Sequence, residues 1–289
     1  MKVAIVGAGG LVGKEFTRQF SKDHQVLPLT HNDLDITDAQ AVRRVIFAEH
    51  PDLIINCAVL GVDACELEPS LAWSVNVSGA EYLAKAADAI DAEFVQVSSN
   101  YVFDGQRQRG SCYTIEDIPN PISVYGQTKL AGERAVSAVS HRCFIFRTSW
   151  VFGVGKENFF SSAHRSLKSK KTIRAITDVW ANSTYVRDLV MRVVEILSTR
   201  HYSTYQVVNS GLCSYYDFAV EAAHILDMSD SEFTQLIEPV KSCEVQRNAK
   251  RPPHTPMHCT VSEEIGLAPL RDWRAALAEY IRDDSCRPA

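Results

Sequence analysis

Five short, almost wholly apolar segments alternate with helical patterns through the first half of the chain. The predicted strands are KVAIVG (2–7), HQVLPLT (24–30), PDLIINCA (51–58), EFVQVSS (93–99) and HRCFIFRTS (141–149). Helical patterns lie between them at 10–20, 38–50, 76–90 and 122–140. Strands that lack polar alternation are buried on both faces, so this order predicts a parallel sheet covered by helices on both sides.

The regular alternation loosens after Trp150. Helices are expected at 157–168, 184–198, 214–226 and 271–283, short strands near 171–176 and 204–208, and a loop at 238–258. We therefore expect an α/β fold, with a Rossmann-type doubly wound parallel sheet and a smaller C-terminal substrate-binding lobe. The expected boundaries are 1–150 for the NAD(P)-binding domain, to which later segments return, and 151–289 for the lobe.

Composition and charge exclude several classes of protein. The formal net charge is −5, and the one basic run is KSKK (168–171), so nucleic acid is not an expected partner. Glycines interrupt the apolar N-terminus within seven residues, which argues against a signal peptide or a membrane span and favours a cytoplasmic protein. The cysteines are scattered without a CxxC motif, so no metal site is expected.

A glycine-rich turn follows the first predicted strand, in the sequence VGAGGLVGKEF. Gly7, Gly10 and Gly13 stand three residues apart, a spacing that differs from GxGxxG. Residues without a Cβ allow a tight turn and a close approach of the backbone to a pyrophosphate at a helix N-terminus. The position of the glycines at a strand–helix junction therefore predicts a dinucleotide site.

The end of the second strand, LTHNDLDITD, bears on the choice of cofactor. Thr30, His31 and Asn32 occupy the turn where an acid would select the ribose 2′-OH of NAD. Since no acid stands there, NADP(H) is favoured over NAD(H). Asp35 and Ile36 are candidates for adenine contact; the alternative is that Asp38 caps the next helix and Ile36 lies in the core.

A tyrosine and a lysine stand four residues apart in SVYGQTKLAGE (123–133), and so share one helix face. An ammonium group beside a phenol lowers its pKa from about 10 and lets it exchange a proton with an alcohol or carbonyl. The strand VQVSS ends in Ser98 and Ser99, on the sheet edge where open α/β folds bind ligands. Together with the glycine turn, Ser99, Tyr125 and Lys129 are the predicted catalytic residues.

In their order and spacing, these motifs resemble the extended short-chain dehydrogenases/reductases, and within them the dTDP-4-dehydrorhamnose reductase family. The resemblance covers nearly the whole chain. The matching segments are GAGGLVG, LDITD, VDACELEPSLAWSVNVSG (62–79), SSNYVFDG, VYGQTKLAGE, RTSWVFG (147–153) and the tail from RP (251–252) through IGLAPLRDWRAALAEYI.

The resemblance implies a role for each predicted catalytic residue. Tyr125 would protonate the 4-keto oxygen of a nucleotide sugar as NAD(P)H delivers hydride. Lys129 would hold the nicotinamide ribose and depress the pKa of Tyr125. Ser99 stands where the family usually has Thr, and its hydroxyl would polarise the carbonyl.

The resemblance also implies two sets of binding residues. The expected cofactor contacts are Gly7, Gly10, Leu11, Val12, Gly13, His31, Asp35, Ile36, Cys57, Ala58, Val59, Asn76, Ser98, Tyr125 and Lys129. The expected substrate contacts are Asn100, Tyr101, Val102, Phe103, Trp150, Val151, Trp180 and Arg251. For Trp150 the alternative is core packing, and for Arg251 a solvated loop charge.

Three departures from the family pattern concern the substrate or the cofactor. Asn100 replaces a usual Asp, DVWANST (178–184) stands where a DQxGxPT-like motif is expected, and His31 replaces a frequent Arg. The resemblance therefore implies a 4-keto sugar nucleotide reductase whose substrate can differ from dTDP-4-dehydrorhamnose. A nucleotide sugar is the expected small-molecule partner, and a homodimer is the expected assembly.

Two other functions remain open at this point. The first is a non-catalytic, NADP-binding regulatory subunit, since the family includes the regulatory beta subunit of methionine adenosyltransferase. The second is an epimerase, which uses the same Tyr/Lys pair with bound NAD. A dehydratase is disfavoured because Asn100 and Tyr101 follow Ser99 where an Asp-Glu pair is expected.

Overall fold

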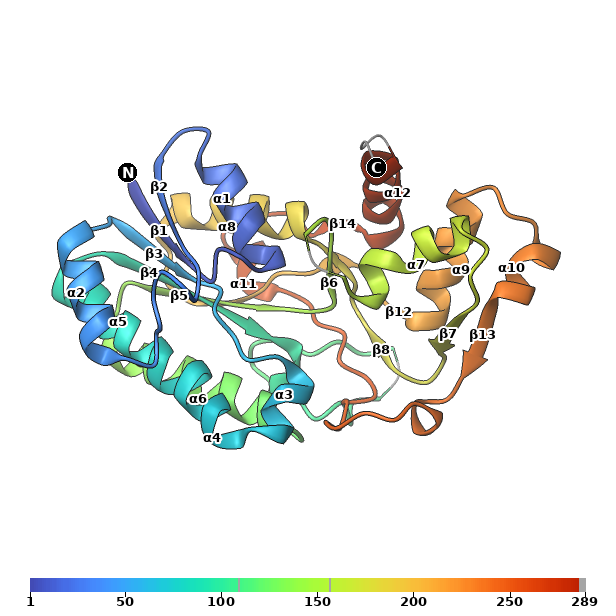
Figure 1. Cartoon of the computed structure of the whole chain (residues 1–289), viewed down its shortest axis with the longest axis horizontal. Coiled ribbons are helices and arrows are strands. Elements are labelled where there is room, and N and C mark those ends of the chain that lie inside the picture. The colour runs from blue at the N-terminus through green and yellow to red at the C-terminus, as the bar shows by residue number, and fades with distance from the viewer. Residues whose placement is uncertain (109, 156, 286–289) are drawn as a thin grey trace.

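A computed structural model describes residues 1–108, 110–155 and 157–285, and its centre is a six-stranded sheet (Figure 1). The strand order is β2–β1–β3–β4–β5–β10, and every neighbouring pair is parallel. The strands are β1 (Lys2–Val6), β2 (Gln25–Leu29), β3 (Leu53–Asn56), β4 (Glu93–Ser99), β5 (Cys143–Thr148) and β10 (Thr204–Gln206). The predicted parallel sheet is confirmed, with each predicted strand of the first half in it.

Helices cover both faces of this sheet (Figure 1). On one face α1 (Leu11–Phe20) packs against α8 (Val186–Thr199), and their apolar side chains share a core with Ile5, Val95 and Phe146. The other face is covered by α2 (Ala39–Glu49), α5 (Ala80–Ala89) and α6 (Val124–Val139). The strands are therefore buried on both sides, which explains their lack of polar alternation.

The strand order reverses between β1 and β3, two neighbouring strands inside the sheet. In open α/β sheets, a reversal of this kind opens a crevice at the carboxyl ends of the strands. The turn after β1, the loop after β3 and the ends of β4 and β5 therefore meet at one edge.

The second half of the chain forms a smaller lobe beside this edge (Figure 1). Its main helices are α7 (Phe159–Lys168), α9 (Tyr215–Ile225), α10 (Asp230–Leu236) and α12 (Trp273–Ser285). Its short strands pair as β6 (Val151–Phe152) with β9 (Thr184–Tyr185), β7 (Ile173–Ile176) with β13 (Ile237–Val240), β8 (Trp180–Ala181) with β12 (Cys213–Ser214), and β11 (Asn209–Ser210) with β14 (Leu270–Asp272). Because α8 and β10 pack with the first sheet, parts of the second half return to it; the functional division between 1–150 and 151–289 stays a prediction.

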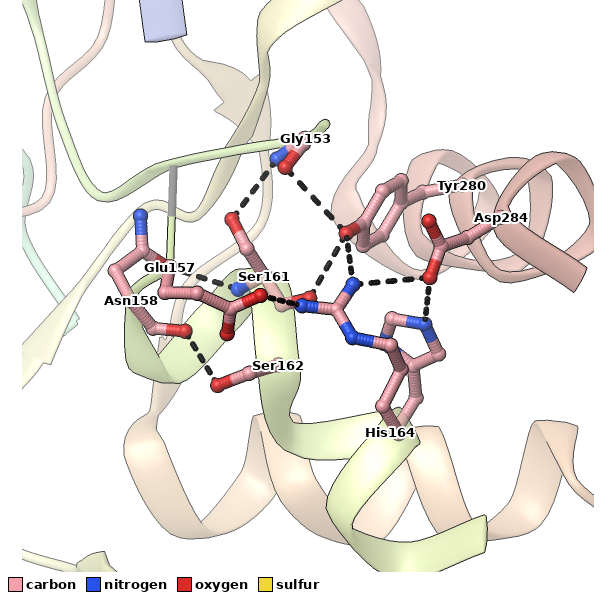
Figure 2. A network of polar contacts seen from close by, with 9 residues as sticks. Gly153, Glu157, Asn158, Ser161, Ser162, His164, Tyr280 and Asp284 are labelled. Carbon is pink, nitrogen blue, oxygen red and sulfur yellow. Dashed lines mark hydrogen bonds and ion pairs between the residues drawn. The ribbon is translucent and has the colours of Figure 1, made fainter. Parts of the chain in front are cut away.

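A polar network joins α7 to α12 within this lobe (Figure 2). The Tyr280 hydroxyl donates to Ser161 O at 2.8 Å and to Gly153 O at 3.4 Å. Asp284 accepts from Arg165 Nη1 at 3.0 Å and lies 2.9 Å from His164 Nε2. The last helix is thus tied to the start of α7 and to the loop at Gly153, which follows β6.

Several short elements complete the described chain. They are α3 (Val62–Leu67), α4 (Pro69–Trp73), the π-helix η1 (Ser74–Gly79), the 3₁₀ turns η2 (Asn100–Val102) and η3 (Ser242–Glu244), and α11 (Thr260–Glu264). Among the described residues, no helix has both the length and the apolar character needed to cross a membrane.

Candidate active site

The glycine turn has the backbone shape that a pyrophosphate site requires. Gly7 has a φ of 77°, and a Cβ there would lie 2.6 Å from Ala58 N. A Cβ on Gly13 would overlap Gly7 O, while Gly10 N donates to that oxygen at 3.0 Å. Positions 7 and 13 therefore have no room for a side chain where α1 begins, and the residues present suit a dinucleotide.

The end of β2 is shaped by a residue that the sequence reasoning missed. Asp33 accepts from Thr30 N at 2.9 Å and from Thr30 Oγ1 at 2.6 Å, and these two bonds lower the pKa of its carboxyl. His31 is exposed beside this turn. The one acid of the turn is thus engaged by Thr30, which leaves the predicted preference for NADP(H) open.

Near the predicted adenine site, Ile36 and Asp38 both have structural roles. Ile36 is buried in the core, where it packs against the position of Gly79. Asp38 caps α2 by accepting from Gln40 N and Ala41 N. Asp35 is exposed, and its carboxylate accepts from Thr37 N and Thr37 Oγ1.

A cleft of about 270 Å³ lies at the carboxyl ends of β3, β4 and β5. Eleven predicted site residues line it: Val12, Cys57, Val59, Ser98, Ser99, Asn100, Tyr101, Tyr125, Lys129, Trp150 and Val151. Val62, Val97, Thr148 and Ser149 also line it, although the sequence reasoning had not assigned them. The structure thus brings the three predicted catalytic residues into one cleft.

Tyr125 lies in the first turn of α6, which begins where Ser123 accepts from Gly126 N. Its hydroxyl takes part in a hydrogen bond with Ser99, the last residue of β4. The ring of Tyr101 meets the Tyr125 ring edge-on, with 5.5 Å between centroids. Ser99 and Tyr101 therefore hold the phenol from two sides.

The predicted depression of the Tyr125 pKa is wrong for this structure. Burial raises the pKa of Tyr125 to about 12, although the Ser99 hydrogen bond acts in the opposite direction. Lys129 is itself buried, and its Nζ donates to Val97 O at 2.6 Å. Because the effect of burial is the larger one, Tyr125 remains a protonated phenol at neutral pH.

Burial lowers the pKa of Lys129 to about 8, and the nearby Glu133 carboxylate opposes this change. The charge of the lysine is therefore finely balanced near physiological pH. Perturbed ionisable groups that converge in a cleft are typical of catalytic sites.

The end of β5 contributes a strained residue and two hydroxyls. Trp150 has a φ of 39°, which is uncommon for a bulky residue, and its ring packs on Phe160 and Tyr215 at 4.7 and 4.6 Å between centroids. Thr148 Oγ1 and Ser149 Oγ are buried and have no hydrogen-bond partner among the described residues. These hydroxyls fit the polar groups of a bound ligand. Trp150 both packs in the lobe and lines the cleft.

Several predicted contacts lie outside the cleft lining. Val102 and Phe103 are fully buried in an apolar cluster with Leu130, so they act as core residues. Asn76 accepts from Leu60 N at 2.9 Å and donates to Thr128 Oγ1 at 3.0 Å, which ties the loop after β3 to α6. Trp180 lies in β8, where its backbone pairs with Ser214 and His254.

Three predicted residues, one of which lines the cleft, have defined contacts in the structure. Arg251 donates to Asp63 Oδ2 at 2.6 Å, and its guanidinium carbon lies 5.9 Å from the centre of the Tyr101 ring. Asn100 donates to Thr255 Oγ1 at 2.6 Å. Ala58 lies against Gly7, as expected for a residue beside the glycine turn. Arg251 is therefore an ordered, paired residue rather than a solvated loop charge.

Comparison with known proteins decides the family. The RmlD substrate binding domain model matches residues 1–286. The chain belongs to this family. It is 36% identical over 284 residues to the dTDP-4-dehydrorhamnose reductase of Mycolicibacterium smegmatis, covering 97% of this chain and 85% of that relative.

Solved structures of RmlD relatives share the whole fold. A dTDP-4-dehydrorhamnose reductase of Clostridium acetobutylicum superimposes with a TM-score of 0.91 at 34% identity, covering 99% of this chain and all of that one. The reductase of Bacillus anthracis, in complex with NADP, gives a TM-score of 0.91 at 31% identity and covers 98% of this chain and 99% of that one. The predicted family and the predicted α/β fold are both confirmed.

Proposed function

We propose that this RmlD-family chain reduces the 4-keto group of a nucleoside-diphosphate 4-keto-6-deoxy sugar with NADPH. The observation that carries the proposal is the convergence of Ser99, Tyr125 and Lys129 in one cleft beside the glycine turn. The relatives named above, which are dTDP-4-dehydrorhamnose reductases, make a dTDP-linked sugar the first substrate to test.

Each catalytic side chain has one task in this mechanism. When bound, the nicotinamide supplies the hydride that reduces the ketone. The Ser99 hydroxyl binds the carbonyl oxygen and orients it toward Tyr125. Tyr125 gives its proton to that oxygen, so the carbonyl becomes an alcohol. Its pKa of about 12 keeps the phenol protonated until the oxygen gains negative charge.

Lys129 and the glycine turn hold the cofactor in this proposal. Backbone N–H groups at the start of α1 bind the pyrophosphate, because Gly7 and Gly13 let it approach. The Lys129 ammonium lies at the end of β4 and binds the nicotinamide ribose. NADPH is the proposed cofactor because the Bacillus anthracis relative was crystallised in complex with NADP.

The sugar nucleotide enters from the C-terminal lobe. Arg251 lies near Tyr101, and the guanidinium carbon of Arg247 lies 5.4 Å from the centre of the Tyr215 ring. These two cations suit the diphosphate, while Trp150 and Tyr101 lie beside the sugar. Asn100 replaces the usual Asp of the family, so this residue can select a different sugar from the one that other family members bind.

The experiment is NADPH oxidation with a panel of nucleoside-diphosphate 4-keto-6-deoxy sugars, with Tyr125→Phe as the control. We expect turnover with at least one sugar and a loss of about 10²- to 10⁴-fold in the variant, with NADPH binding retained. NADPH binding without oxidation of the cofactor by any sugar contradicts the proposal and favours a regulatory subunit. Inversion of a sugar alcohol without net cofactor oxidation favours an epimerase.

A further inference from the structure

One face of α6 contacts the last three residues of β4. Tyr125, Lys129 and Glu133 are spaced by four residues and therefore lie along one side of the helix. Tyr125 bonds with Ser99, and Lys129 Nζ donates to Val97 O. Glu133 accepts from the Ser98 hydroxyl. Ser98 therefore directs its hydroxyl at Glu133, although the residue also lines the cleft.

Glu133 is held in a buried ion pair as well. Arg147 donates to it through Nε at 3.0 and 3.2 Å and through Nη2 at 2.7 Å. Arg147 lies directly opposite Ser98 in the pairing of β4 with β5, so both donors reach the same carboxylate. The Glu133 and Arg147 side chains are only 5% and 8% exposed.

A buried ion pair is weak support for stability, because removing two charges from water costs about as much as their attraction returns. The position of this pair points to another role. Lys129 is buried one helical turn away, and burial alone favours its neutral form. A lysine that must stay charged in such a place requires a fixed anion nearby.

The other ionisable groups that face Lys129 do not supply that anion. Cys57, at the end of β3, has its thiol pKa raised to about 12 by burial. Burial also raises the thiol pKa of Cys65, on α3. Tyr125, on α6 itself, remains a phenol. Among the described groups around Lys129, Glu133 is therefore the carboxylate that favours its charged form.

We propose that Glu133 is a positioning residue for the reduction: Arg147 and Ser98 fix its carboxylate, and it keeps the Lys129 ammonium charged and bound to the end of β4. This inference rests on the proposed function only in assigning Lys129 to the cofactor. The coupling of Glu133 to Lys129 can be measured without any substrate.

The test is an NMR titration of the protein labelled with ¹³Cε-lysine, in which Lys129→Arg assigns the Lys129 signal. In Glu133→Gln we expect the Lys129 midpoint to fall by about one pH unit or more. The basic limb of kcat/KM should move to lower pH by a similar amount. A matched control is Glu81→Gln, which removes an exposed partner of Lys85 on α5 and should leave both readouts unchanged.

A second variant covers the case in which Glu133→Gln fails to fold, since it leaves Arg147 buried without a charged partner. The double variant Glu133→Gln/Arg147→Met removes both charges, and we expect the same fall in the Lys129 midpoint. Glu133→Asp keeps the anion and should return the midpoint toward that of the parent. A Lys129 midpoint that is unchanged in the folded double variant would overturn the proposal, whereas absent turnover in the parent would affect only the proposed function.

Discussion

At the scale of single residues, Tyr125 and Lys129 differ in which of them changes charge near neutral pH. Tyr125 is bonded to Ser99 and keeps its proton, since burial raises its pKa to about 12. Lys129 is bonded to Val97 O and has a pKa lowered to about 8. The phenol is therefore suited to give a proton, and the lysine is the group whose charge changes near neutral pH.

The charge of Lys129 should appear in the pH dependence of the reaction. Lys129 is charged below its pKa of about 8, so kcat/KM should fall as the pH rises through that value. The measurement is a pH profile of NADPH-dependent reduction. Lys129→Arg keeps its charge to much higher pH and should lack this limb, whatever its absolute rate. An identical limb in that variant would assign the titration to another group.

Ser99 offers a second residue-scale prediction, because its hydroxyl bonds with Tyr125 and accepts from Tyr101 N at 3.2 Å. Ser99→Ala should lower kcat by about 10²-fold, since the carbonyl and the phenol lose a shared partner. Ser99→Thr keeps the hydroxyl and should retain most of the activity. Steady-state kinetics check both, and equal losses in the two variants would contradict a role for the hydroxyl.

At the scale of elements, the glycine turn should tolerate a methyl group at one position and not at another. A Cβ on Gly13 would overlap Gly7 O, whereas a Cβ on Gly9 would meet only Thr30 Cγ2 at 3.8 Å. Gly13→Ala should lower the free energy of unfolding by about 1–3 kcal/mol and weaken NADPH binding. Gly9→Ala is the control for stability. Chemical denaturation and a fluorescence titration measure the two effects, and an unaltered Gly13→Ala protein would contradict the described turn.

Long elements with a clear period were predictable from the sequence, and short ones were not. The sequence predicts a strand at 93–99 and a helix at 122–140, close to the observed bounds of β4 (Glu93–Ser99) and α6 (Val124–Val139). The helices α3 and α4 have only six and five residues, too few to show a helical period. The predicted loop at 238–258 is wrong at its start, where β13 pairs with β7 although it contains Pro239, a residue that argues against a strand.

The candidate site, too, was only partly predictable from the sequence. Ser99, Tyr125 and Lys129 were identifiable because spacing on one helix and position at a strand end carry over into space. The direction in which the pKa of Tyr125 shifts was not predictable from the sequence, since it depends on burial in the folded chain. Glu133 lies on α6 and Arg147 on β5, and they meet because α6 packs against that strand in the folded chain.

At the scale of the whole molecule, the two halves of the chain share packing and polar contacts. Leu11, beside the glycine turn, belongs to the same apolar core as Trp273 and Tyr280 near the C-terminus. Tyr280 donates to Gly153 O within the lobe (Figure 2), and Arg251 donates to Asp63 Oδ2 between the two halves. The lobe and the sheet therefore stabilise one another.

Removing one charge from the network in Figure 2 tests how much this network contributes to the stability of the lobe. Although burial opposes it, hydrogen bonds from Arg165 and His164 lower the pKa of Asp284. A depressed carboxyl pKa contributes stability above its unfolded value of about 3.9, and that stability is lost as the pH falls through the folded value. Asp284→Asn should therefore lower the free energy of unfolding at pH 7 by about 1–2 kcal/mol, and the difference should shrink in acid.

The neighbouring residue provides the matched control for this prediction. Asp283 pairs with Arg187, and both side chains are 33% exposed. Asp283→Asn should change stability by less than about 1 kcal/mol. Urea denaturation of both variants at neutral and acidic pH measures the difference. If Asp283→Asn lowers the free energy of unfolding as much as Asp284→Asn does, the network contributes no more to stability than an exposed ion pair.

The most direct test of the central claim follows a label from the cofactor to the sugar. NADPH deuterated at C4 of the nicotinamide, incubated with the chain and a dTDP-4-keto-6-deoxy sugar, should give a 4-hydroxy product that contains one deuterium by mass spectrometry. Tyr125→Phe should bind the same cofactor and yield almost no labelled product. Undiminished label transfer in Tyr125→Phe, or tight cofactor binding by the parent with no labelled product from any 4-keto sugar, would contradict a Tyr125-dependent reductase.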